Sequence, residues 1–322
     1  MTVELLLLRH GKSDWDTQSD DFSRPLKDRG KRAAQRIGVW LAQHELEPDY
    51  IISSPAERAL VSAQKCCKAM GLAAQRIHPE PRAYAATTDM LLAVLADCPR
   101  QAKRVMLVAH NPALEELLSL LSADVIQRPE DGKLLPTATL ARLKMNENWN
   151  KLKQGCATVE SIIRPRELPK KFPFPSPHGN ESRDRPAYYY AQSSVIPWRI
   201  KNGEVEILVI LSSKKKHRVV PKGIWEPGLT ARESAAKEAL EEAGIEGLVA
   251  DSAIGTYVYP KWGASCTVEV YPMEVSRVLP DEEWQEAHRG REWVSLKQAA
   301  NRLKQDKLKP MLWQLAAMLK KE

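Results

Sequence analysis

The sequence predicts an α/β protein made of two domains. Its 322 residues are enough for two domains of ordinary size, each with a core of its own. In both halves, short apolar runs with the length of buried strands alternate with segments of helical periodicity. Between the halves, residues 164–186 are rich in proline and basic residues and show no apolar period. We therefore expect a first domain over residues 1–163, a semi-rigid linker over 164–186 and a second domain over 187–322.

The composition narrows the classes of partner. A net charge of +7 suits nucleic acid or phosphate-rich small molecules. No arginine-rich tract or interleaved aromatic stripe favours nucleic acid, so we expect a phosphorylated small molecule or a phosphoprotein instead. The five cysteines make no disulfide or zinc pattern, which favours reduced thiols and a cytoplasmic location. The apolar run Leu5–Leu8 is too short for a membrane span, and no membrane partner is expected.

The first half begins with an apolar run, Glu4–Leu8, that predicts a buried strand. A helix is expected over Leu26–His44, and another begins after Ser54. Further strands are predicted at Tyr50–Ser53, Arg104–Val108, Thr137–Met145 and Thr158–Ile163, with helices near Asp89–Leu95 and Leu114–Leu121.

Four polar residues follow the ends of these strands. Arg9 and His10 follow the first, Arg58 lies just after the second, and His110 follows Arg104–Val108. In a mainly parallel sheet the carboxyl ends of the strands share one edge. Two guanidinium groups can hold phosphate oxygens while one imidazole attacks phosphorus. The sequence therefore predicts a phosphate pocket at this edge.

The run Leu7-Leu8-Arg9-His10-Gly11-Lys12-Ser13-Asp14-Trp15, with Phe22-Ser23-Arg24-Pro25-Leu26, resembles the SixA-type branch of the histidine phosphatase superfamily. The resemblance implies a three-layer α/β domain with a mainly parallel sheet and no cofactor. It also implies that His10 is phosphorylated while Arg9, Arg58 and His110 bind the transferred group. A phosphohistidine protein is then a possible partner.

Larger branches of that superfamily carry an acidic residue that protonates the leaving oxygen, within an insertion that this sequence lacks. Asp14, Glu57 and Glu80 are the candidates, and none fits well. A substrate with a good leaving group needs no strong acid. Phosphohistidine and phosphoanhydrides therefore fit this sequence better than phosphate esters.

In the second half, Ala187–Ile200 and Val205–Leu211 read as a hairpin around Asn202-Gly203. The most informative stretch is Val220–Ile245, a loop that leads into a helix. Thr230 and Glu233 form a capping box, and Gly244 suits the helix end. Later strands are expected near Gly255–Val258, Thr267–Val275 and Glu292–Val294, with a final helix at Lys309–Leu319.

Three carboxylates share one face of the Val220–Ile245 helix. Glu238, Glu241 and Glu242 stand at i, i+3 and i+4, so their charges repel unless a cation binds. Oxygen ligands at this spacing suit Mg²⁺ or Mn²⁺. The alternative interpretation is a solvated acidic face without a metal.

Gly223 with Lys237-Glu238-Ala239-Leu240-Glu241-Glu242-Ala243-Gly244-Ile245 resembles the signature of the Nudix hydrolases. The resemblance implies an α/β/α sandwich that cleaves phosphoanhydrides, with Glu238, Glu241 and Glu242 as metal ligands and Glu241 also catalytic. Two positions depart from the family pattern: Leu229 replaces a glutamate and Lys237 replaces an arginine. In the family those two side chains interact. Basic residues before the helix are candidate substrate contacts, namely Lys214, Lys216, Arg218 and Lys222.

These observations predict a two-domain phosphohydrolase, with a Mg²⁺-dependent (or Mn²⁺-dependent) phosphoanhydride site and a phosphohistidine intermediate. A second hypothesis is a protein phosphohistidine phosphatase regulated by a Nudix-like domain that senses a ligand without turnover. A third, an RNA or polyphosphate binding module, rests on charge alone.

Overall fold

The computed structural model describes residues 2–130 and 132–320. The chain divides into two compact units, residues 1–186 and 187–322. Each is described separately below.

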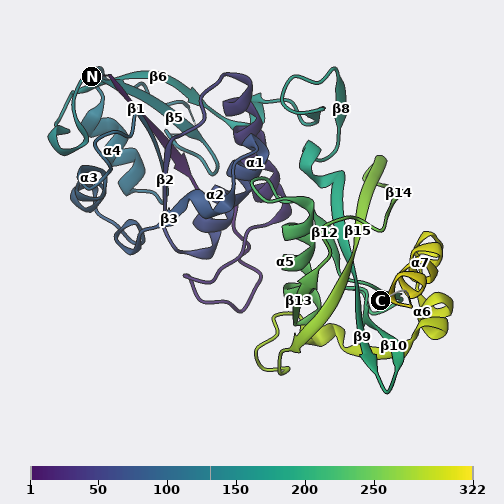
Figure 1. The fold of residues 1–322 in the computed structure, drawn as a ribbon. Helices are drawn as coiled ribbons and strands as arrows, with labels where there is room; N and C mark the ends of the chain where they lie inside the picture. Colours follow the sequence, from purple (N-terminus) through teal and green to yellow (C-terminus); the bar gives the residue numbers. More distant parts are fainter. Residues whose placement is uncertain (1, 131, 321–322) are drawn as a thin grey trace. The chain divides into compact units, whose positions relative to one another are not determined.

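The first unit contains a six-stranded sheet in the order β3-β2-β4-β1-β5-β6 (Figure 1). The first four strands in this order are parallel to one another, and β5 and β6 are antiparallel. The predicted mainly parallel sheet is confirmed. The strands are β1 Val3–Arg9, β2 Tyr50–Ser53, β3 Ile77–Pro79, β4 Arg104–Ala109, β5 Leu140–Met145 and β6 Ala157–Ile163.

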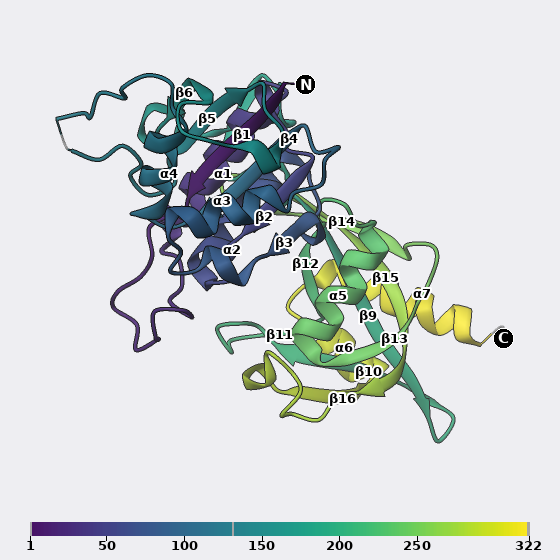
Figure 2. The same ribbon diagram turned by 90° about the vertical axis from the view of Figure 1, so that its left-hand side faces the viewer.

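Helices cover both faces of this sheet (Figures 1 and 2). Strand β1 shows why, because it is apolar on both sides: Leu5 and Leu7 pack with α3 and α4, whereas Leu6 and Leu8 pack with α1 and α2. Alternate residues of a strand point to opposite faces, so a continuous apolar run requires two cores. The helices are α1 Asp28–Gln43, α2 Glu57–Met70, α3 Thr88–Ala96 and α4 Ala113–Leu121.

Residues 164–186 differ from the extended linker that the sequence predicts. They form a short hairpin of β7 (Phe172–Phe174) and β8 (Glu181–Arg183), which groups with the first unit. Phe172 is buried, and Leu168 packs against the core beneath α1 and α2. The prolines hide this anchoring in the sequence, because a single buried phenylalanine leaves no apolar period.

The second unit is built on an eight-stranded mixed sheet, with β11-β10-β9-β15-β13 in order and β12, β14 and β16 paired to β9, β15 and β10. The strand predicted over Ala187–Ile200 begins later than expected: β9 starts at Ala191, after a 3-10 turn over Ala187–Tyr189, so the tyrosine run lies before the strand. The strands are β9 Ala191–Lys201, β10 Glu204–Leu211, β11 Arg218–Val219, β12 Lys222–Ile224, β13 Ile245–Val249, β14 Gly255–Lys261, β15 Ala264–Val278 and β16 Arg291–Ser295.

Helix α5 (Ala231–Ala243) covers one face of this sheet, and α6 (Leu296–Arg302) and α7 (Lys309–Leu319) cover the other (Figure 1). Along β10, Leu208 and Ile210 face α5, whereas Ile207 and Val209 face α6 and α7. The capping box of Thr230 and Glu233 and the left-handed Gly244 bound α5 as predicted. The two-domain α/β fold class is therefore confirmed. The structure adds to the predicted elements the strands β3, β7, β8, β11, β12 and β13 and the helix α6.

In the described part of the chain, no helix combines the length and the apolar character needed to cross a bilayer.

Candidate active sites

The first candidate site lies at the carboxyl ends of the parallel strands. Arg9 is the last residue of β1 and His10 follows it; Arg58 lies in the first turn of α2, directly after β2. His110 follows β4. The ring centroids of His10 and His110 are 5.0 Å apart. The positive charges of Arg9 and Arg58 lower the pKa of both rings. The sheet thus brings together the four residues that the sequence singled out.

His10 is buried and held by its own loop. Its Nδ1 atom lies 2.7 Å from the carbonyl oxygen of Gly11, so Nδ1–H donates there and the lone pair stands on Nε2. Burial, together with the charges of His110, Arg58 and Arg9, lowers the pKa of His10 to about 3. The ring is therefore neutral at physiological pH, which is the form that can attack phosphorus.

His110 is fixed through its other nitrogen. Its Nε2 lies 2.8 Å from the hydroxyl of Ser54, while its Nδ1 is buried without a hydrogen-bond partner. Burial, followed by the charge of Arg58, lowers the pKa of His110 to about 4. If the Ser54 hydroxyl donates to Nε2, then Nδ1 carries the proton and can donate to a bound oxygen.

Each of the two arginines has one guanidinium nitrogen that forms no hydrogen bond within the protein. Arg9 donates from Nη1 to the carbonyl of Leu135 (2.8 Å), and its Nε is buried without a partner. The Nε of Arg58 is likewise buried and unpartnered. Because buried N–H groups are normally satisfied, three such nitrogens around His10 are suited to a polyoxygen anion such as phosphate.

Asp21 is a site residue that the sequence analysis missed. Its carboxylate accepts hydrogen bonds from Arg24 (2.6 Å), Arg58 (2.9 Å) and the Tyr84 hydroxyl (2.9 Å). It lies in an irregular loop, where no periodicity marks a position as inward-facing. Two of the acids that the sequence offered as candidates pair with basic residues other than Arg9 and Arg58: Asp14 with Lys27, and Glu80 with Arg82.

The second candidate site is the carboxylate face of α5. Glu238 lies against the backbone of β12: a Cβ atom added to Gly223 would stand 1.8 Å from its carboxylate. Burial, together with the charges of Glu242 and Glu241, raises the pKa of Glu238 to about 8. A buried carboxylate with like-charged neighbours is stabilised by a cation.

The other two carboxylates have protein partners. Glu242 accepts a hydrogen bond from the backbone N–H of Lys222 (2.9 Å) and pairs with the buried Arg289. Glu241 lies 3.5 Å from Lys237. Over residues 2–130 and 132–320, no three acidic, histidine or cysteine side chains form a ready metal-binding group. The donor set consists of oxygens, which fits Mg²⁺ or Mn²⁺, but these side chains would have to turn to bind one together.

Glu226 is the second residue that the sequence analysis missed. Its buried carboxylate lies 2.9 Å from Nζ of Lys237. Glu226 stands three positions before Leu229, where the family pattern has its glutamate. The Glu-Pro-Gly sequence around it was visible, but only the loop conformation shows that this carboxylate reaches Lys237.

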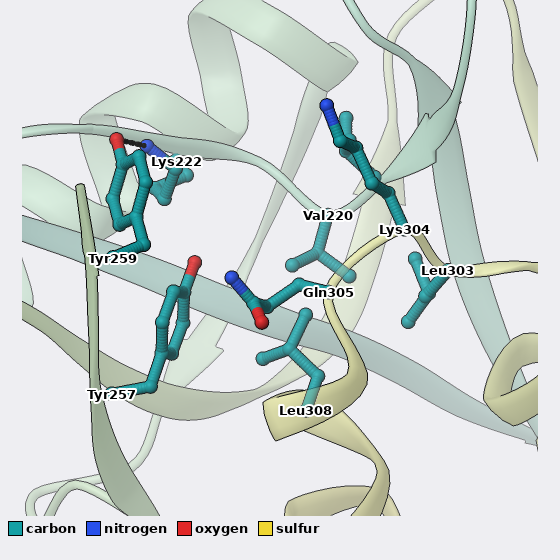
Figure 3. Close-up of a pocket in the computed structure, with 9 residues that line it drawn as sticks. Val220, Lys222, Tyr257, Tyr259, Leu303, Lys304, Gln305 and Leu308 are labelled. Carbon is teal, nitrogen blue, oxygen red and sulfur yellow. Dashed lines mark hydrogen bonds between the residues drawn. The ribbon is translucent and has the colours of Figure 1, made fainter. Parts of the chain in front are cut away.

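Lys222 links the carboxylate face to a neighbouring pocket of about 200 Å³ (Figure 3). Its Nζ donates to Gln192 (2.6 Å) and to the Tyr259 hydroxyl (2.9 Å), and burial lowers its pKa to about 8. Apolar side chains and a few polar groups line this pocket, among them Val220, Tyr257, Leu303, Lys304, Gln305 and Leu308.

The remaining predicted substrate contacts lie outside this pocket. Lys214 and Lys216 are exposed between β10 and β11, and Arg218 pairs with Glu292 at 2.9 Å. Of the four basic residues, the structure therefore brings only Lys222 to the pocket.

Comparisons with known proteins match one family to each half of the chain. Residues 5–83 match the model of the histidine phosphatase superfamily (branch 1), and residues 191–314 match the NUDIX domain. Each half of the chain is thus similar to one known family. Both families are hydrolases, and NUDIX domains generally use Mg²⁺ or Mn²⁺. The predicted family resemblances are confirmed. The histidine phosphatase match ends before His110, which the sheet itself brings beside His10.

Individual relatives cover one half of the chain each. Nudix hydrolase 12, mitochondrial, of Arabidopsis thaliana is 28% identical over 142 residues, which are 36% of this chain and 69% of that protein. Nudix hydrolase 21, chloroplastic, of the same plant is 36% identical over 111 residues, 32% of this chain and 54% of that protein. A solved structure named for the phosphohistidine phosphatase SixA of Nakamurella multipartitia shares 25% identity, covering 51% of this chain and 97% of that one with a TM-score of 0.44.

Proposed function

We propose that this protein is a two-site phosphohydrolase. The histidine phosphatase region removes phosphoryl groups through a phosphorylated His10, and the NUDIX domain cleaves a phosphoanhydride of a nucleotide or another polyphosphorylated small molecule. A phosphorylated small molecule, or a phosphohistidine protein, is the partner of the first site.

The observation that carries the phosphatase proposal is the set of unpartnered buried nitrogens around a neutral His10. Arg9 Nε, Arg58 Nε and His110 Nδ1 supply three donors for phosphoryl oxygens. Nε2 of His10 attacks phosphorus, the leaving group departs, and water then cleaves the phosphohistidine bond. The donors stabilise the negative charge that develops on the equatorial oxygens.

The test is acid-labile phosphorylation of the full chain. Wild-type protein mixed with a phosphohistidine peptide or p-nitrophenyl phosphate should form a phosphoenzyme, and His10→Asn should form none and lose turnover. Ordinary turnover by His10→Asn would remove His10 from its proposed role. NUDIX activity of the same preparation reports that the protein is folded.

For the NUDIX site, we propose that Glu238, Glu241 and Glu242 hold Mg²⁺ or Mn²⁺, with Glu241 also taking part in catalysis. When bound, the cation neutralises the diphosphate and lowers the pKa of a bound water. Lys222 stands between this face and the 200 Å³ pocket, a position suited to holding a phosphate while the rest of the substrate enters the pocket.

Turnover of nucleotides, dinucleoside polyphosphates, inositol pyrophosphates and polyphosphate by the full chain, titrated with Mg²⁺ and Mn²⁺, tests this proposal. Glu242→Gln should lose turnover and leave phosphatase activity intact. Metal-independent turnover, or an unaffected Glu242→Gln, would return these carboxylates to an ordinary solvated face.

The alternative is that the NUDIX domain senses a ligand without cleaving it and regulates the phosphatase. Leu229 and Lys237 favoured this hypothesis. The contact between Lys237 and Glu226 weakens it, because the orienting ion pair is present after all. Ligand binding without any Mg²⁺-dependent hydrolysis in the screen above would support the sensor. We also propose that both sites act in the cytoplasm.

A further inference from the structure

Asp21 accepts more side-chain donors than its place in an exposed loop would suggest. Two arginines and a tyrosine converge on one carboxylate whose side chain is still 51% exposed. Arg24 and Arg58 are themselves buried, so they hold the carboxylate from the protein side. The arrangement fixes the half-exposed Asp21 carboxylate on Arg58 and Tyr84, and Tyr84 in turn packs edge-on to His110 at 5.9 Å.

We propose that Asp21 is the proton donor and acceptor of the phosphatase site, and that this site therefore hydrolyses phosphate monoesters as well as phosphohistidine. This inference rests on the proposed phosphatase function of His10. It adds a substrate class that the sequence alone disfavours, because Asp14, Glu57 and Glu80 offer no convincing acid.

The position of Asp21 depends on Arg58, whose guanidinium group binds Asp21 through its two Nη atoms and leaves Nε unpartnered. Its Nη2 donates to a carboxylate oxygen of Asp21, and its Nη1 donates to the backbone carbonyl of the same residue. Its Nε remains unpartnered and buried. One guanidinium can thus hold a phosphoryl oxygen through Nε while its other edge keeps Asp21 beside the bound group.

The charges around Asp21 keep its carboxylate ionised in the free protein and favour its protonation once a phosphorylated substrate is bound. In the free protein, hydrogen bonds from Tyr84 and Arg58 outweigh the effect of partial burial and keep the pKa of Asp21 below its usual value. The charged and titratable groups that face it are Arg24, Arg58, Tyr84, His110 and Asp20. A bound phosphoryl group adds negative charge and draws on Arg58, and both effects raise the pKa of Asp21.

In this proposal Asp21 transfers a proton in each half of the reaction. A monoester monoanion brings one proton, which Asp21 takes. His10 Nε2 then forms a bond to phosphorus as the P–O bond to the leaving group breaks, and Asp21 gives its proton to that oxygen, releasing the alcohol. In the second half, Asp21 accepts a proton from water as the water oxygen bonds to phosphorus and the bond to His10 breaks. Asp21 returns this proton to the phosphate, which leaves as the monoanion, so Asp21 is again ionised and His10 is again neutral.

The neighbouring surface suits an organic leaving group. Phe22 follows Asp21 and is 43% exposed, and its ring packs edge-on to Tyr84 at 5.1 Å. Trp15 is 67% exposed, with Arg24 over one face of its ring at 3.5 Å. An aryl or other apolar alcohol can lie against these rings while its phosphate enters the pocket.

The experiment compares leaving groups in the full-length protein. Phosphohistidine peptide and p-nitrophenyl phosphate have good leaving groups, whereas phenyl phosphate and an alkyl phosphate do not. Asp21→Asn keeps the size of the side chain and removes its proton-transfer capacity. Asp20→Asn is the matched control, because the Asp20 carboxylate accepts hydrogen bonds from Ser23 and from the backbone of Phe22. Asp21→Glu retains a carboxyl group.

With Asp21→Asn, we expect kcat on phenyl and alkyl phosphates to fall on the order of 10²–10⁴-fold, the usual effect of losing a general acid, while phosphohistidine turnover is largely retained. Asp21→Glu should recover part of the loss, and Asp20→Asn should resemble wild type. An equal loss on all substrates, a lower KM without a change in kcat, or a wild type inactive on every monoester would each overturn the inference. A wild type inactive on phosphohistidine as well would instead overturn the proposed function.

Discussion

Nζ of Lys237 lies 2.9 Å from the buried carboxylate of Glu226, and the two residues belong to different parts of the NUDIX loop-helix unit. Glu226 comes from the loop after β12, whereas Lys237 is on α5, one residue before Glu238. The ion pair therefore ties the loop to the carboxylate face. Lys237 also lies 3.5 Å from Glu241, so it is shared between an orienting partner and a proposed metal ligand.

Replacing Glu226 with Gln should weaken metal binding. Without the Glu226 charge, Lys237 turns toward Glu241 and competes with the cation for it. Loss of a residue that orients metal ligands typically costs about 10–100-fold in metal affinity, so the Mg²⁺ concentration for half-maximal turnover should rise by that order. Glu283→Gln, on an exposed side chain, is the control. An unchanged Mg²⁺ titration of Glu226→Gln would show that Lys237 needs no partner.

Gly223→Ala should inactivate the NUDIX site selectively. A methyl group there would stand 1.8 Å from the Glu238 carboxylate, which must move away from β12. Because the displaced atoms are the end of a flexible side chain, the fold should survive while Mg²⁺-dependent turnover falls. Phosphatase activity of the same variant is the internal control. If Gly223→Ala retains normal NUDIX turnover, Glu238 does not act from this position.

The stability of the first unit should depend on pH through its two pocket histidines. The folded pKa values of His10 and His110 are about 3 and about 4, whereas an unfolded histidine titrates near pH 6.5. Between these limits the unfolded chain binds more protons, so the free energy of unfolding is highest above about pH 6.5 and falls as the pH is lowered toward 4. Each histidine contributes a slope of about 1.4 kcal/mol per pH unit.

Denaturant unfolding at several pH values between 7 and 4.5 measures this slope. His10→Asn should reduce it, and so should His110→Asn, whereas His78→Asn, which changes an exposed histidine, should leave it unchanged. Identical slopes in all four proteins would mean that the pocket histidines are not held neutral by the fold.

Phe172→Ala should release residues 164–186 from the first unit. Phe172 is 1% exposed, and removing a buried phenylalanine side chain typically costs about 3–5 kcal/mol. Much of that cost should appear as local opening of the hairpin, because β7 and β8 pair only with each other. Limited proteolysis followed by mass spectrometry should show faster cleavage within 164–186. Phe174→Ala, whose ring lies under Arg183, is the matched variant and should have a smaller effect.

The sequence predicted those features of the fold and the site that follow from apolar periodicity and from the order of the strands. Arg9, His10 and His110 follow apolar runs, so their meeting at one sheet edge could be inferred before the structure. Asp21 and Glu226 could not, because each lies in an irregular loop and acts through loop conformation. Neither residue type nor spacing distinguishes Asp21 from Asp14 or Asp20.

Lys214 and Lys216 illustrate the opposite difficulty. A dense basic run suggests phosphate binding, but the hairpin between β10 and β11 carries these side chains into solvent, while Lys222 reaches the pocket. The density of positive charge along the sequence does not show whether a side chain points into solvent or into a pocket. Lys222 was identifiable only as one of four candidates, and its depressed pKa follows from burial that the sequence does not report.

The pocket around His10 also has an order of assembly in time. Arg9 donates to Leu135, 126 positions later, and His110 arrives with β4. A ribosome adding 5–20 residues per second needs on the order of ten seconds to span that interval. During this period the nascent chain already carries His10, the proposed nucleophile, but lacks His110 and Leu135, which complete its surroundings. The phosphoryl transfer proposed for His10 therefore has to wait until the chain has been synthesised at least to Leu135.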